Sequence, residues 1–190
     1  MKLITKMLAL VAMQLCLNPS ELKAQAFGIN KGDSVDRFLH TPITDNFHMV
    51  EPPIPNRNFV SYMTFSAPDV GVCKVIGMSK THKNDHYGNS VRSLFTEIGT
   101  LLDEVYGPGV LIDHVNEGAL DLPQFWVMEI HNKERVYGKG YAKDLPKGLT
   151  AIFLEVVAKD LISARIELTY EFENMEDCRS HMNRGQTNGL

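Results

Sequence analysis

Two histidines four residues apart, His82 and His86, are the residues best spaced to bind a metal ion. Two imidazoles at this spacing converge on one ion only if the segment is helical. Here Asn84 and Gly88 favour a turn, which would leave both rings in a polar loop. We therefore expect no metal site and no cofactor, and we name His82 and His86 as the candidates for metal ligands.

A second group could support acid–base chemistry. Asp113 and His114 are neighbours in the chain, and His131 follows 17 residues later. A histidine oriented by a carboxylate can act as a general base, so these three residues are the candidates for a hydrolase site assembled in space. The chain has no serine or cysteine in a tight glycine-flanked elbow of the kind that hydrolases use for the nucleophile. We therefore expect a noncatalytic protein, and a small periplasmic hydrolase is the alternative.

A third group is suited to contact with another protein. Tyr137 and Tyr141 flank Gly138 and Gly140 in a segment that resembles a strand, and Trp126 lies shortly before them. Aromatic side chains are enriched at interfaces, and glycine within a strand marks a bulge or a close approach by another group. These five residues are the predicted binding residues. The alternative is that the aromatic rings belong to the core.

The N-terminus has the pattern of an export signal. Two lysines precede the apolar run 7–17, and small residues follow at Ala24 and Ala26. The run is about half the length that a membrane-spanning helix needs, so we expect cleavage after Ala26 and no membrane span in the mature protein. Residues 1–26 are thus a predicted signal peptide, and the mature protein is expected in the periplasm or secreted.

Removal of the signal also removes Cys16 and leaves Cys73 and Cys178. An even pair of cysteines in an oxidising compartment predicts one disulfide, and two buried free thiols are the alternative.

Composition and charge limit the class of protein. The 190 residues are 44% hydrophobic and 22% charged, as in ordinary globular domains. The formal net charge is −4; without the three lysines and one glutamate of the predicted signal, 16 basic and 22 acidic residues remain, a net charge of −6. An acidic domain without a basic cluster is a poor ligand for phosphates, which argues against nucleic acid as the partner. The expected partner is another envelope protein, and the oligomeric state is left open.

The hydrophobic patterns predict an α+β domain. Apolar residues at helical spacing predict one long amphipathic helix over 91–105, and a shorter helix is expected over 33–39. Period-two and β-rich segments predict three hairpins, and we interpret 107–123 as a long loop. The predicted hairpin strands are 59–65 with 72–78, 125–131 with 135–142, and 149–158 with 161–173. The resulting fold is an antiparallel sheet built from hairpins and packed on one long amphipathic helix, with short terminal helices. Residues 27–182 form the predicted single domain, and 183–190 a flexible tail.

Several short elements occur in a suggestive order along the chain. They are Phe27-Gly28, Gly32-Asp33-Ser34, Gly71-Val72-Cys73-Lys74-Val75, Tyr106-Gly107, Trp126, Tyr170-Glu171-Phe172-Glu173-Asn174 and Cys178. In this order the sequence resembles a family of small exported bacterial proteins without an assigned activity. The resemblance implies an exported, disulfide-bonded globular domain, and it implies no catalytic residues.

Overall fold

The computed structural model describes residues 25–187, which form two antiparallel sheets, three α-helices and two short 3₁₀ turns. The strands are β1 (Gln25–Ala26), β2 (Ile29–Asn30), β3 (His40–Pro42), β4 (Phe47–Val50), β5 (Ser61–Ala67), β6 (Gly71–Met78), β7 (Val110–Val115), β8 (Arg135–Tyr141), β9 (Leu149–Ala158) and β10 (Ala164–Phe172). The helical elements are η1 (Val35–Arg37), α1 (Asn89–Tyr106), η2 (Pro123–Phe125), α2 (Trp126–His131) and α3 (Met175–Thr187).

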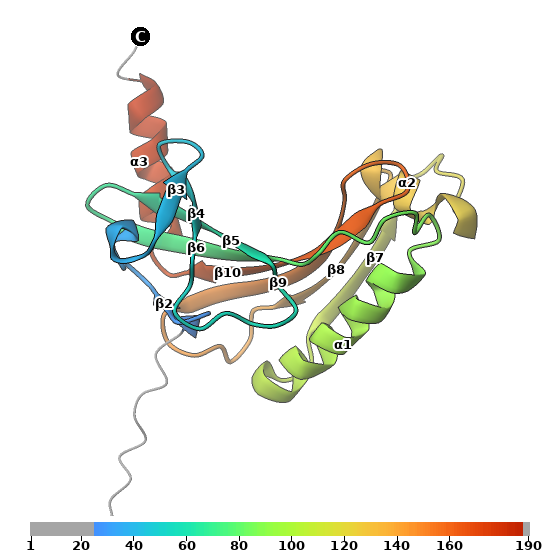
Figure 1. The fold of residues 1–190 in the computed structure, drawn as a ribbon, viewed down its shortest axis with the longest axis horizontal. Coiled ribbons are helices and arrows are strands. Elements are labelled where there is room, and N and C mark those ends of the chain that lie inside the picture. Colours follow the sequence, from blue (N-terminus) through green and yellow to red (C-terminus); the bar gives the residue numbers. More distant parts are fainter. Residues whose placement is uncertain (1–24, 188–190) are drawn as a thin grey trace, which may run out of the picture.

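The larger sheet has eight strands in the order β3-β4-β5-β6-β10-β9-β8-β7, and every adjacent pair is antiparallel (Figure 1). Two four-stranded meanders, β3 to β6 and β7 to β10, therefore meet at the central pair of β6 and β10. The α+β class and the antiparallel sheet are confirmed. The sheet, rather than a helix, is the dominant element of the fold.

Helix α1 supplies the main covering of one face of the sheet. Its buried side chains include Val91, Phe95, Ile98 and Leu102, and the helix packs chiefly against β9 and β10. The helix has 18 residues, so the expectation of one long helix that carries the sheet is not confirmed. At the start of the helix, the Asp85 carboxylate accepts a hydrogen bond from the Val91 N–H at 2.9 Å.

Strand β10 shows the alternation that its sequence predicts. From Ala164 to Phe172 every second residue is buried and the residues between are half-buried. The buried set, with that of β9, faces α1 and forms the main hydrophobic core. The other set points to the opposite face of β8, β9 and β10, which we call the open face. Residues on the two faces thus have separate roles in the same strands.

Two sequence predictions in the C-terminal half are wrong. Residues 126–131, predicted as a hairpin strand, form helix α2, and the segment 107–123, predicted as a loop, contains strand β7. Helix α2 is favoured because Trp126 packs on Tyr137 and Glu129 bonds Arg135, and both partners lie on β8. The partner of β8 in the second hairpin is accordingly β7.

The predicted ends of the domain fall in different places in the structure. The predicted signal peptide lies outside the described residues except for Gln25 and Ala26. These two residues form β1 and pair with β2, and Ala26 is fully buried. At the other end, α3 continues to Thr187, into the segment expected as a flexible tail. Within residues 25–187, no helix combines the length and the apolar character needed to cross a membrane.

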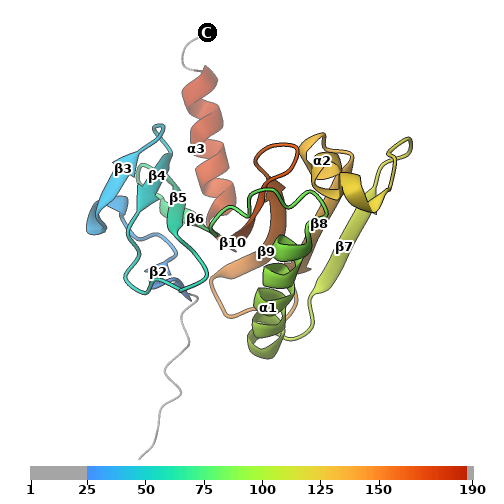
Figure 2. The same ribbon diagram turned by 45° about the vertical axis from the view of Figure 1, so that its right-hand side comes forward.

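A disulfide joins Cys73 of β6 to Cys178 of α3, as predicted. Both cysteines are fully buried, and Phe65 and Ala67 complete a second, smaller core around them. Figures 1 and 2 show α3 on the side of the sheet opposite α1. The disulfide therefore fixes the helix that covers one end of the open face.

Loss of this disulfide should destabilise the protein markedly. The crosslink closes a loop with a sequence separation of 105 residues, for which chain entropy gives up to about 4.7 kcal/mol. We expect the double variant Cys73→Ala/Cys178→Ala to lose about 2–5 kcal/mol of unfolding free energy in guanidinium titrations. A reducing agent should destabilise the wild type similarly and leave the variant unchanged; equal stability of the two proteins without reductant would contradict the prediction.

Candidate functional site

The two edges of the large sheet differ in how they are protected. Strand β3 at one edge has three residues and ends in Pro42, features that prevent pairing with another strand. Strand β7 at the other edge has six residues, Val110–Val115, and contains neither proline nor lysine. An extended edge of this kind is a template on which a further strand can form. The candidate site is therefore built from β7.

The hydrogen bonds of β7 show which of its backbone groups are free to pair. The Asn116 N–H donates to the Glu134 carbonyl at 2.8 Å, in register with the β7–β8 ladder. Because the bonding direction alternates along an antiparallel strand, the even-numbered residues of β7 bond to β8. Leu111, Asp113 and Val115 consequently direct their N–H and C=O groups away from the sheet.

The side chains of β7 are unusually apolar for an edge. Val110 is 70% exposed and Leu111 is 56% exposed. Val110 and Ile112 lie on the open face, directly opposite Gly140 and Gly138 of β8. The apolar surface thus extends from the edge onto a part of β8 that has no side chains.

Phe153 of β9 fills the space above the two glycines. A Cβ atom at Gly138 would lie 2.7 Å from the Phe153 ring, whereas one at Gly140 would lie 3.7 Å from it. The close approach expected at these glycines is therefore made by an aromatic ring of the neighbouring strand. An aromatic side chain that covers glycine in this way compensates for the lost cross-strand packing.

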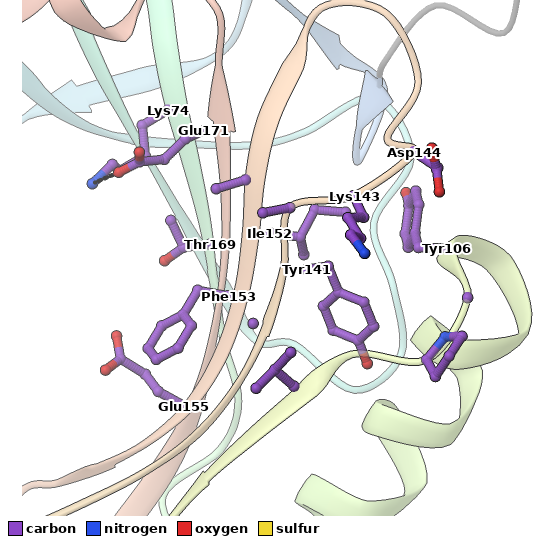
Figure 3. A pocket seen from close by; sticks show the side chains of 16 residues that line it. Lys74, Tyr106, Tyr141, Lys143, Asp144, Ile152, Phe153, Glu155, Thr169 and Glu171 are labelled. Atoms are coloured by element: carbon purple, nitrogen blue, oxygen red, sulfur yellow. Dashed lines mark ion pairs between the residues drawn. The ribbon is translucent and has the colours of Figure 1, made fainter.

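A groove of about 840 Å³ adjoins this part of the open face. Val110, Gly140 and Phe153 line it on one side, and Tyr106 and Pro108, at and after the end of α1, line it on another. Figure 3 shows the Phe153 ring between Thr169, Glu155 and Tyr141, with the Lys74–Glu171 pair further along the sheet. Apolar walls with a few charged groups are typical of a binding groove.

The charges of the open face are unevenly paired. Lys74 forms an ion pair with Glu171 at 2.8 Å, and Arg165 binds Glu167. Glu155 lies directly opposite Glu167 on the neighbouring strand and makes no hydrogen bond or ion pair within the described residues. Burial, together with the nearby Glu167 carboxylate, raises the pKa of Glu155 above its ordinary value. The groove therefore has an acidic side chain without an ion-pair partner among the described residues, and Lys74, already paired with Glu171, opposes the rise of its pKa only in part.

Strand β7 is held in place by a cluster around Arg135, whose side chain is only 7% exposed. Its guanidinium binds Glu129 of α2, Asp113 of β7 and Asp121 of the loop between them. Three carboxylates around one guanidinium give the cluster a formal charge of −2. Strand β7 is therefore anchored to β8 through Arg135, and the surface beside it has a net negative charge.

The predicted aromatic binding residues lie mainly inside the molecule. Trp126 and Tyr141 are buried in the core, and Tyr137 is half-buried against Trp126. Tyr141 donates to Asp103, and burial raises the pKa of the phenol. Of the five predicted residues, Gly140 and Tyr141 line the groove, and Gly138 lies beside it under the Phe153 ring.

The histidine candidates are not gathered into one site. Asp113 and His114 are successive strand residues and point to opposite faces, and Asp113 is bound to Arg135. His131 ends α2, and no hydrogen bond or ion pair joins it to Asp113 or His114 within residues 25–187.

The predicted metal candidates are likewise apart from any ligand cluster. His82 forms a backbone bridge to Ala164, and the His86 ring packs on Tyr87. Asp85, the carboxylate between them, caps α1. Among the described residues, no three His, Cys, Asp or Glu side chains are grouped so that they could hold a metal ion.

The sequence analysis did not identify the residues that form this edge as functional. Val110, Leu111 and Ile112 form a short apolar run after a glycine, and Asn116 follows as a turn residue. Such a run is typical of a strand. In six residues, however, apolar and polar side chains alternate too few times to distinguish the strand from a loop. Phe153 and Glu155 belong to a predicted strand, but their relation to the β8 glycines depends on register.

Substitution of the two β8 glycines should distinguish the effect of a clash with Phe153 from the effect of alanine on the stability of a strand. Gly138→Ala places a methyl group against the Phe153 ring and 3.1 Å from the Leu154 carbonyl oxygen, so we expect a loss of about 1–3 kcal/mol in unfolding free energy. Gly140→Ala is the matched control, with an expected change within about 0.5 kcal/mol. Equal effects of the two variants in urea titrations would show that Phe153 does not occupy the space above Gly138.

The raised pKa of Glu155 makes a prediction about pH. A carboxyl with a folded-state pKa above its unfolded value of 4.5 stabilises the fold at lower pH, and this contribution is lost as pH rises through the folded pKa. Glu155→Gln should therefore be more stable than the wild type at pH 7, by up to about 1 kcal/mol, and equally stable at pH 3.5–4. Thermal melts at both pH values test this, with Glu104→Gln as the control for loss of one exposed charge. A gain that is independent of pH would contradict the assignment.

Comparison with known proteins does not classify this arrangement. No protein-family model matches the chain, no curated protein matches it, and no solved structure matches it.

Proposed function

We propose that the protein is an exported, noncatalytic binding protein that acts by contact with another protein of the envelope. Its contact surface is the β7 edge together with the adjoining groove. A binding protein of this kind could be an inhibitor or immunity protein, or an accessory of envelope assembly. The proposal includes membership of the small exported bacterial proteins that the sequence resembles.

One observation carries the proposal: β7 is a six-residue edge strand with exposed apolar side chains and a row of outward backbone groups that bond to no other residue within 25–187. Natural sheets usually protect such an edge with proline, lysine, a bulge or a covering element. The other edge of this sheet has a short strand and Pro42. An unprotected edge that is firmly anchored is therefore better explained as a contact surface than as a defect.

The disulfide supports the location. Structural disulfides persist in oxidising compartments and are rare in the cytosol. The fully buried Cys73–Cys178 bond links β6 to α3 and belongs to a packed core. This supports a periplasmic or secreted protein, in agreement with the export signal predicted from residues 1–26.

Site-specific photo-crosslinking in the producing cell tests the proposal. A photoreactive phenylalanine analogue at Val110 should yield a discrete crosslinked product in the envelope fraction. The matched control is Val60, which is 68% exposed against 70% for Val110 but does not lie on β7. We expect at least about a tenfold greater yield from Val110. Equal labelling at the two positions, or none at Val110, would contradict a contact surface at β7.

A further inference from the structure

We infer that the occupant of the β7 edge is an extended segment of a partner protein that adds a further antiparallel strand, with a basic residue opposite Asp113 and apolar residues on the open face. This inference rests on the proposed function and specifies the chemistry of its partner. It follows from three independent features: the free backbone groups, the charge of the edge and the shape of the open face.

The backbone groups fix the mode of binding. Leu111, Asp113 and Val115 offer three N–H and three C=O groups in the plane of the sheet, as derived from the β7–β8 register. Within a protein complex, another extended chain can satisfy all of these donors and acceptors together, because its own groups alternate at the same spacing. Strand addition gives affinity through the main chain and specificity through alternate side chains. An antiparallel arrangement continues the pattern of the rest of the sheet.

The charge of the edge selects the residue opposite Asp113. The Asp113 side chain is 42% exposed although it binds Arg135, and the Asp121 side chain is 67% exposed. With Glu129 these carboxylates outnumber the single guanidinium by two. In an added strand, the side chain directly opposite Asp113 lies about 5 Å from it, Cβ to Cβ. A lysine or arginine at that position is attracted by the excess negative charge, and a glutamate is repelled.

The open face selects the neighbours of that basic residue. Successive strand residues alternate between faces, so the partner residues opposite Val110 and Ile112 lie on the open face. They meet the side chains of Val110 and Ile112 and, beyond them, the Phe153 ring above the glycines of β8, at the border of the groove. Valine or isoleucine suits the position opposite Ile112, and a large apolar side chain suits the one opposite Val110.

The same charge disfavours a second copy of this chain as the occupant. Two identical edges in a symmetric dimer bring the same surface patch together from both subunits. Each patch here contains the Arg135 cluster with its formal charge of −2. A basic partner segment has the complementary charge, whereas a second copy has the same one.

Synthetic peptides test the inference on the full-length protein. The probe is acetyl-Thr-Val-Lys-Val-Thr-Phe-amide, which places lysine opposite Asp113 and phenylalanine opposite Val110 in the antiparallel register. In NMR titrations we expect amide shifts concentrated in β7. The peptide with glutamate in place of lysine should bind about tenfold more weakly. A peptide N-methylated at the residues that face Leu111, Asp113 and Val115 should not bind, because it lacks the main-chain donors.

Two protein variants complete the test. Leu111→Pro removes an outward N–H without touching the β7–β8 ladder, so it should abolish binding and leave the other amide signals in place. Asp113→Asn should weaken the lysine peptide about three- to fivefold and leave a threonine-substituted peptide unchanged, since only the former pairs with the carboxylate. If Leu111→Pro does not fold, the N-methylated peptide still tests the main-chain contact.

Several results would overturn the inference. These are equal binding of the lysine and glutamate peptides, binding of the N-methylated peptide, and no binding of any peptide at millimolar concentration. A dimer in analytical ultracentrifugation that Leu111→Pro dissociates would assign the edge to a second copy instead. If the peptides fail while Val110 still gives a crosslinked partner in cells, the proposed function stands and only the chemistry of its occupant is wrong.

Discussion

Every strand at the edge of an open sheet has a row of backbone N–H and C=O groups that no neighbour satisfies, and this constraint organises the molecule. At β3 the row is short and ends in Pro42, so little is left to satisfy. At β7 the row runs through six residues with apolar side chains. One edge of the sheet is therefore protected against pairing with a further strand, whereas the other edge is available for it.

An available edge is useful only if it keeps its shape, and two polar clusters hold β7 and β8 in place. Arg135 links β8 to β7, α2 and the loop between them, and Lys139 of β8 forms an ion pair with Asp103 of α1. Hydrogen bonds from Lys139, the Gly109 N–H and Tyr141 lower the pKa of Asp103, so this carboxylate stays charged. Ion pairs like these are weak evidence for stability, but they do fix the relative positions of the elements that they join. The Arg135–Asp113 pair fixes β7 against β8.

The sequence predicted the parts of the fold that depend on local periodicity. The strict alternation of 164–172 and the helical spacing of 91–105 correspond to β10 and α1. Residues 126–131 were misassigned because Trp126, Val127 and Ile130 favour a strand in isolation, while contacts with β8 favour a helix. The candidate site was harder to predict, because Asp113, Asp121 and Glu129 are separated in the chain and only Arg135 brings them together. Its glycines were identified as unusual, but the ring that they accommodate comes from a strand whose register the sequence does not specify.

The glycines of β8 connect the edge to the groove. Glycine weakens a strand, because it has no side chain to pack and loses more entropy on ordering. Two of them at alternate positions leave a channel on the open face from β7 to Phe153, and Phe153 fills its inner end above Gly138. A side chain at Gly138 would collide with the Phe153 ring, and one at Gly140 would lie directly opposite Val110 and fill the channel. The packing that the two glycines do not provide is then supplied by the partner, because the side chains of the added strand contact the apolar groups of β7 that the protein alone leaves exposed.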